Sequence, residues 1–292
     1  MTLAAAVLLA GCAPAGGGDD GPARPVAELV PDPALAACVA TAAGLPDASA
    51  TVSPGALARI TRLECAGQAH PEEPVRSLAG LQRLTGLTEL DAPHNEISDL
   101  APLAGLAHLS TLTLTGNAVG DLSPLAGLEL FDLGLSQNPV SDLSPLAGTT
   151  TLTALGVAGA QLTDIGPLAG HDGLRTLDLS GNAITDVAPL AGLPSLDTLR
   201  LSRNQVVDPA PLGTVPTLLV LDVFGNRISD VRGLAAAPLL QELQLGANPV
   251  TDLTPLVQVR SLVDLGLDET DTRGVTGIPE LRAAGVSVNG LA

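Results

Sequence analysis

Leucine and a few polar residues recur along this chain with a period of 22 residues. Between Leu174 and Leu190 the unit reads L-x-x-L-x-L-x-x-N-x-I-x-D-x-x-P-L, with Asn182 and Asp186 as its polar marks. The asparagine column runs through Asn95, Asn117, Asn138, Asn182, Asn204, Asn226 and Asn248. The interval before Asn138 is one residue short, and Ala160 stands where one asparagine is missing. Such a period predicts a stack of nearly identical units.

Each position of the unit has a physical role. Side chains alternate across a strand, so the L-x-L pair predicts a short strand that turns both leucines inward. The asparagine suits a sharp turn, where its amide can bond backbone groups and form a ladder along the stack. The aspartate that follows, as in Asp186, precedes x-x-Pro-Leu and is placed to cap a single turn of 3-10 helix. No unit can bury its own leucines, but stacked neighbours can.

These motifs resemble the leucine-rich repeat family in its 22-residue, internalin-like form, over about residues 30–290. The resemblance implies an α/β solenoid, a right-handed superhelix with short parallel strands on its concave face and 3-10 turns and loops on its convex face. It also implies a helical cap at the N-terminal end. The sequence departs locally from the pattern, since Thr149 and His171 replace a convex leucine and the loop from Ala66 to Pro74 is lengthened. We expect small distortions of the curvature there.

The chain begins with a segment that resembles a bacterial lipoprotein signal. A short apolar run ends in Leu9-Ala10-Gly11-Cys12, and a stretch rich in Gly, Ala and Pro follows. The resemblance implies cleavage before Cys12 and attachment of lipid to that cysteine, and small residues at 10 and 11 suit a narrow peptidase site. Met1 and Thr2 supply no positive charge, so the alternative is an uncleaved terminus or a misassigned start.

The expected organisation has five parts. They are a signal peptide (1–11), a lipidated cysteine with a flexible tether (12–25), an N-terminal helical cap (26–62), the repeats (63–274) and a C-terminal cap (275–292). Asp32 and Pro33 predict the start of the cap helix, with Asp32 as its N-cap.

Whether the two cysteines that follow Cys12 form a disulfide depends on export of the protein from the cytoplasm. Cys38 lies on the predicted cap helix, and Cys65 lies two residues after Leu63, on the first predicted strand. In an oxidising compartment they predict a disulfide that ties the helix to the strand, worth about 3–4 kcal/mol in the chain-entropy model. Two buried free thiols are the alternative.

Composition narrows the classes of partner. The apolar fraction of 46% excludes a disordered chain, and with only two aromatic residues, Phe131 and Phe224, the core must consist of Leu, Val, Ile and Ala. The chain has 31 acidic residues against 13 arginines and no lysine, for a formal net charge of −18. Nucleic acids and anionic membranes attract clustered cations, so neither is an expected partner. No apolar run approaches the ~20 residues of a membrane-spanning helix.

The informative positions face outward between and beside the strand leucines, on the surface that such solenoids commonly use for binding. Along the stack these positions are small, polar and acidic. At one spot aromatic, apolar and arginine side chains have the composition of an interface hot spot. Its residues are Phe224, Val220, Arg200, Asp222, Asp178 and Arg203. In the alternative interpretation Arg200 merely bridges Asp178 and Asp222, a contact worth about 0–1 kcal/mol, and Phe224 covers the sheet.

The sequence gives little indication of catalysis or of metal binding. The sequence has no phosphate loop and no serine nucleophile elbow. His94, beside Glu89 and Asp91, offers an adventitious metal site, for which a plain surface histidine is the simpler interpretation. We therefore predict that the protein is not an enzyme and holds neither cofactor nor metal.

Together these features predict a lipid-anchored, extracytoplasmic module at the bacterial cell surface that recognises a protein partner through its concave face. The membrane would be contacted through the N-terminal lipid only, and we expect a monomer. Many partners share this fold, so the fold does not identify one. The alternative is a structural spacer of the envelope or cell wall that binds nothing tightly.

Overall fold

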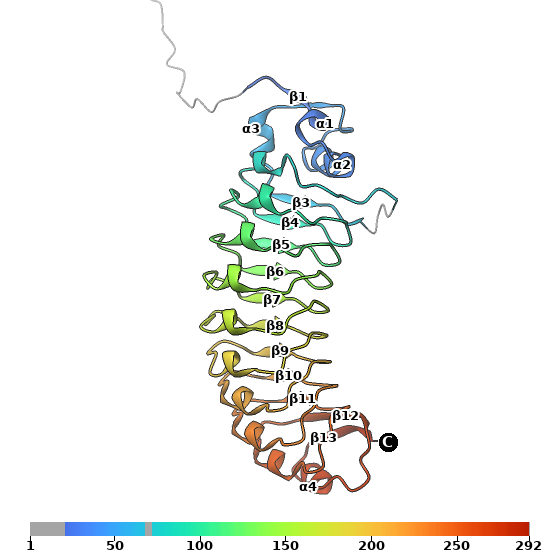
Figure 1. The fold of residues 1–292 in the computed structure, drawn as a ribbon, viewed down its shortest axis with the longest axis vertical. Coiled ribbons are helices and arrows are strands. Elements are labelled where there is room, and N and C mark those ends of the chain that lie inside the picture. The colour runs from blue at the N-terminus through green and yellow to red at the C-terminus, as the bar shows by residue number, and fades with distance from the viewer. Residues whose placement is uncertain (1–20, 68–71, 292) are drawn as a thin grey trace, which may run out of the picture.

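The strands of this protein stack one above another into a curved solenoid, as the computed structural model, which describes residues 21–67 and 72–291, shows (Figure 1). One sheet of 11 strands follows the order of the sequence from β3 to β13. Its strands are β3 (Arg62–Glu64), β4 (Glu89–Asp91), β5 (Thr111–Thr113), β6 (Asp132–Gly134), β7 (Ala154–Gly156), β8 (Thr176–Asp178), β9 (Thr198–Arg200), β10 (Val220–Asp222), β11 (Glu242–Gln244), β12 (Asp264–Thr270) and β13 (Ser287–Leu291). Neighbours are parallel and in register, so that Leu177 pairs with Leu155 and with Leu199. The predicted leucine-rich repeat solenoid is confirmed.

The convex side consists of 3-10 turns, which stack along one side of the sheet (Figure 1). They are η2 (Leu81–Arg83), η3 (Ala101–Leu103), η4 (Ser123–Leu125), η5 (Ser144–Leu146), η6 (Gly166–Leu168), η7 (Ala188–Leu190), η8 (Ala210–Thr214), η9 (Arg232–Ala236) and η10 (Thr254–Gln258). Proline occupies an early position in most of them, where its missing N–H costs nothing.

A column of eight aspartates fixes the start of these turns. Asp186 Oδ1 accepts the N–H of Ala188, the first residue of η7, at 2.8 Å. The same bond recurs at Asp99, Asp121, Asp142, Asp164, Asp208, Asp230 and Asp252. The aspartate therefore lies one residue before the N-cap, which in η7 is Val187 and has no side-chain bond. Hydrogen bonds from Ser123 hold the pKa of Asp121 below its ordinary 3.8, so this carboxylate is ionised at neutral pH.

The interior combines leucines with the predicted asparagine ladder. Leu177 and Leu179 are fully buried, as are their counterparts in the other repeats. Asn204 Oδ1 accepts the N–H of Ile184 at 3.0 Å, and its Nδ2 donates to the carbonyls of Leu179 and Leu201 at 2.9 and 3.0 Å. Each asparagine thus joins its own repeat to the repeat before it, as predicted.

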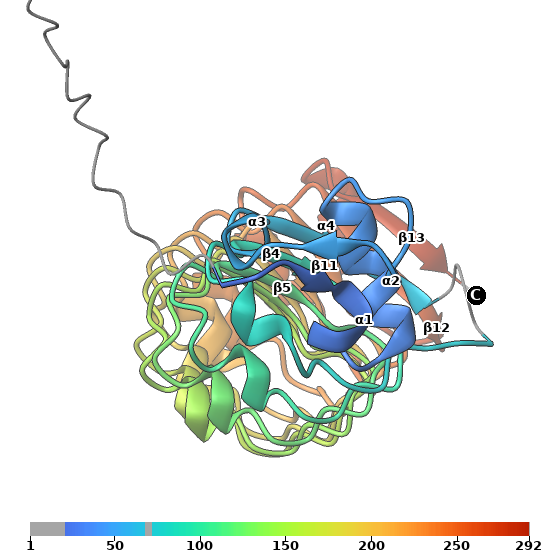
Figure 2. The ribbon, with the colours of Figure 1, turned by 90° about the horizontal axis from the view of Figure 1, so that it is seen from above.

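A small cap covers the N-terminal end of the stack (Figure 2). It contains β1 (Arg24–Pro25), α1 (Val26–Leu29), α2 (Pro33–Ala42), β2 (Thr51–Val52) and α3 (Pro54–Leu57). Asp32 caps α2 by accepting the N–H of Leu35 at 3.0 Å. Its second oxygen accepts the N–H groups of Arg76 and Ser77 at 2.8 and 3.0 Å, so one carboxylate also fastens the cap to the repeats.

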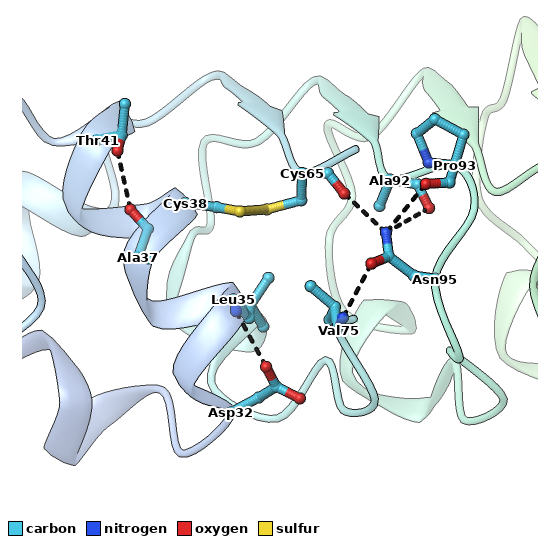
Figure 3. Close-up of a disulfide and its surroundings, with 10 residues drawn as sticks. All are labelled: Asp32, Leu35, Ala37, Cys38, Thr41, Cys65, Val75, Ala92, Pro93 and Asn95. Atoms are coloured by element: carbon cyan, nitrogen blue, oxygen red, sulfur yellow. Dashed lines mark hydrogen bonds between the residues drawn. A yellow bond between two sulfur atoms is a disulfide. The ribbon is translucent and has the colours of Figure 1, made fainter. Parts of the chain in front are cut away.

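A disulfide makes the second link between cap and repeats. Cys38 of α2 is bonded to Cys65, which follows β3 directly, across a Cα–Cα distance of 5.7 Å and a sequence separation of 27 (Figure 3). The predicted pairing is confirmed, and the alternative of two free thiols is wrong. Because disulfides persist in oxidising compartments, the protein is extracytoplasmic.

The C-terminal end is closed by α4 (Ile278–Ala283) and by β13, which adds a last parallel strand beside β12. The sequence indicated a closing segment here but not its strand. At the other end of the chain, the predicted signal and Cys12 lie outside the described residues. Within residues 21–67 and 72–291, no helix is both long and apolar enough to cross a membrane.

Candidate binding site on the concave face

Three neighbouring strands carry the predicted binding residues. The register of β8, β9 and β10 places Arg200 between Asp178 and Asp222, at the same level of the sheet. Val220 begins β10, and Phe224 follows it two residues after Asp222. Side chains at these alternate positions face the same side of the strand, opposite to the buried leucines.

An open hollow of about 460 Å³ lies beside these strands. It is lined by Ser180, Gly181, Ser202, Arg203, Asp222, Phe224 and Gln244. The structure thus brings together three predicted residues, Arg203, Asp222 and Phe224. Val220, Arg200 and Asp178 belong to the same strands but do not line the hollow. The small lining residues Ser180 and Ser202 were not predicted. Their one sequence signal is the spacing of the repeat, which places them in the same column as Phe224.

The two aspartates bond to their own backbone rather than to Arg200. Asp178 Oδ1 accepts the N–H of Ser180, and Asp222 Oδ1 accepts the N–H of Phe224, both at 3.0 Å. Among the described residues, no ion pair joins Arg200 to either aspartate. The bridging geometry of the alternative interpretation is therefore not the one observed.

Arg203 has a left-handed backbone, with φ of 55°. The residue before each asparagine adopts this conformation, and in the adjacent repeats it is a glycine, Gly181 or Gly225. A Cβ added to Gly225 would lie 3.5 Å from Cγ of Arg203, so the stem of this arginine extends over the glycine of the next repeat. Arg203 thus has a backbone conformation that glycine adopts with less strain than a residue with a Cβ. Its side chain is exposed beside the hollow. The glycines that recur in this column are the sequence signal for that conformation.

Two other residues singled out by the sequence lie apart from the hollow. Phe131, the other aromatic residue, is 49% exposed and precedes β6, four strands away from β10. His94 has the left-handed conformation of its column, with φ of 56°. Within the described part of the chain, no group of three or more His, Cys, Asp or Glu side chains is arranged to hold a metal ion.

Comparisons with known proteins agree with this geometry. The family model described as "Leucine Rich repeats (2 copies)" matches residues 85–127 and 172–213, and that described as "Leucine Rich repeat" matches residues 216–231. A search of the curated proteins gives no match.

Among solved structures, an internalin (inlF) from Listeria monocytogenes is 30% identical, with a TM-score of 0.86, and the match covers 92% of this chain and 78% of that chain. Internalin C2 from the same organism is 32% identical, with a TM-score of 0.64, over 87% of this chain and 100% of that one. A plant peptide hormone receptor, RGFR1 in complex with RGF2, shares the fold at 19% identity and a TM-score of 0.54, over 73% of this chain and 41% of that one. The chain therefore belongs to the leucine-rich repeat family, and over most of its length it is similar to the internalins of Listeria.

Proposed function

We propose that this protein is a binding module whose concave face, at the hollow beside β9 and β10, holds a protein partner. The observation that carries the proposal is that Phe224 and Arg203 line the same hollow. Arg203, and Arg200 on the neighbouring strand β9, are exposed and form no ion pair among the described residues. Aromatic and arginine side chains dominate the energetics of protein interfaces. A solenoid of the same fold, the plant receptor RGFR1, was solved in complex with RGF2, which illustrates such a use of the scaffold.

Charge indicates the kind of partner. The protein has a formal net charge of −18, and the concave face carries acids toward both of its ends, such as Glu89 and Asp264. Complementary charge steers association and selects partners. We expect the partner to present basic groups to those ends and the hollow to supply the central contact.

Capture by the immobilised protein tests the proposal. The variant Val220→Ser/Arg200→Glu/Phe224→Ser is compared with wild type and with Phe131→Ser, a matched control that removes the other phenylalanine, which is exposed. We expect envelope and medium extracts to yield a protein retained by wild type and by the control but lost with the triple variant. Equal capture by all three would contradict the proposed surface, and binding insensitive to ionic strength would contradict the electrostatic part.

A lipid anchor at Cys12 completes the proposal. It is supported by the lipobox-like Leu9-Ala10-Gly11-Cys12 and by the disulfide, which is typical of exported proteins. In a bacterial host, metabolic labelling with a palmitate analogue should mark the wild type and not Cys12→Ser. Label that persists in the variant would contradict the anchor.

The spacer function is the second candidate, and the bare middle of the face favours it. Ala154, Gly156 and Ala158 leave the sheet around β7 without side chains that could grip a partner. Under this alternative, Cys12→Ser abolishes any cellular phenotype of the protein, and the triple variant leaves it unchanged.

A further inference from the structure

The strands on either side of β9 share a hydrogen bond that β9 lacks. In β8 and β10 an aspartate ends the strand and accepts the N–H two residues further on, Asp178 from Ser180 and Asp222 from Phe224, both at 3.0 Å. β9 ends in Arg200 instead, in register with both aspartates. The N–H of Ser202 occupies the equivalent backbone position and has no acceptor among the described residues.

Two arginines distinguish Ser202 from other positions of its column. The N–H groups of Thr115, Ser136 and Gly246 also lack an acceptor among the residues that the structure describes, but no arginine adjoins them. Ser202 lies between Arg200 and Arg203, and it lines the hollow together with Arg203. Arg200 stands in the register position that an aspartate holds in β8 and β10, and Arg203 is exposed at the hollow beside Ser202.

We propose that Ser202 N–H, Arg200 and Arg203 bind a carboxylate of the partner, in the place that an aspartate of the chain takes in β8 and β10. This inference rests on the proposed function, whose central contact it specifies. Hydrogen bonds from an arginine to a carboxylate are charge-assisted and often bidentate, which gives them both strength and direction. Asp178 and Asp222 stand nearby, but each already accepts a backbone N–H, from Ser180 and from Phe224.

The hollow also indicates where the carboxylate comes from. It is open, and the concave face continues on both sides across β8 and β11, so an extended chain can pass over it. Phe224 offers an apolar surface beside the donors. The ligand is therefore the side chain of an aspartate or glutamate that is flanked by apolar residues in an extended segment of the partner.

Amide NMR of the full chain tests the inference with blocked peptides. The probe is acetyl-Leu-Asp-Leu-amide, and its control is acetyl-Leu-Asn-Leu-amide, which has the same shape without the charge. We expect the aspartate peptide to move the Ser202 amide proton downfield and the asparagine peptide to leave it in place. An unmoved Ser202 amide, or equal shifts with both peptides, would overturn the inference. A shift produced only by acetyl-Leu-Asn-Leu with a free C-terminal carboxylate would overturn the side-chain source.

The variant Arg200→Asp gives a second, independent readout. It restores the residue type of the neighbouring strands, so the Ser202 amide should lie downfield without peptide and lose its response to the aspartate peptide. Thr113→Asp adds the same charge on β5, four strands away, and should leave the response of Ser202 intact. If captured protein is lost with Phe224→Ser but retained by Arg200→Asp, the proposed function stands and this inference falls.

Discussion

The repeats from β8 to β11 and the region around β7 share one template but differ in their interiors. In the first region, Asn182, Asn204, Asn226 and Asn248 form an unbroken ladder of side-chain to backbone bonds. Around β7, Ala160 supplies no amide, and the N–H of Val140, which an asparagine at that position would bind, has no acceptor among the described residues.

Buried polar groups mark the same region. Thr149 is 3% exposed and His171 is 0% exposed, in a column that elsewhere holds apolar residues such as Leu193 and Val215. His171 Nε2 lies 3.1 Å from the carbonyl of Leu146. The Thr149 hydroxyl and His171 Nδ1 have no partner within the part of the chain that the structure describes. Such groups lower stability because they lose hydration without gaining a bond.

The sheet nevertheless continues unchanged through β6, β7 and β8, in register on both sides. Each repeat contacts only its neighbours, so a solenoid's stability is approximately a sum of local terms. The comparison teaches that the regular and the irregular region should respond separately, and in opposite directions, to mutation.

The largest expected effect on stability comes from removing one asparagine from the ladder of the regular region. Asn204→Ala leaves the N–H of Ile184 without its acceptor, at a cost of about 2–3 kcal/mol in the free energy of unfolding. Urea denaturation measures this cost against Gln205→Ala, an adjacent residue whose side chain makes no hydrogen bond among the described residues. A loss below about 1 kcal/mol would show that water takes the place of the missing amide.

The second largest expected effect on stability comes from replacing the buried His171 by leucine. His171→Leu removes the unpaired Nδ1 and restores the side chain of the column, while the carbonyl of Leu146 still accepts the N–H of Thr149 at 2.8 Å. We expect a gain of about 1–2 kcal/mol. The matched control is His108→Leu, the same change at an exposed position, for which we expect no gain. Destabilisation by His171→Leu would mean that Nδ1 has a water partner.

Completing the ladder gives a smaller gain. Ala160→Asn places an acceptor at the N–H of Val140 and should stabilise the protein by about 1 kcal/mol. Ala118→Asn, outside the ladder column and exposed, serves as the control in the same urea titration. If Ala160→Asn has no effect, the gap is already filled by a water molecule.

Much of this architecture could be predicted from the sequence because the same pattern of residues recurs in each repeat, although one copy alone would be weak evidence. The spacing of leucines, asparagines and aspartates predicted strand, ladder and turn, and Asp32-Pro33 predicted the start of α2. The sequence did not show that aspartates end β8 and β10 by binding their own backbone, since that bond depends on a backbone direction that no pattern encodes. The N–H of Ser202, which has no acceptor among the described residues, and the hollow beside it could not be predicted for the same reason.

The smallest expected effect separates stability from binding at Arg203. Its φ of 55° is unfavourable for any residue with a Cβ, so Arg203→Gly should stabilise the protein by about 0.5–1 kcal/mol while weakening capture of the partner. Gln137 has the same conformation, with φ of 59°, and does not line the hollow, so Gln137→Gly should give the same gain and leave capture intact. Urea denaturation and capture, measured on both variants, decide the matter. If Arg203→Gly captures the partner as well as Gln137→Gly does, the strained arginine takes no part in recognition, and the contact must come from Arg200 and Phe224 alone.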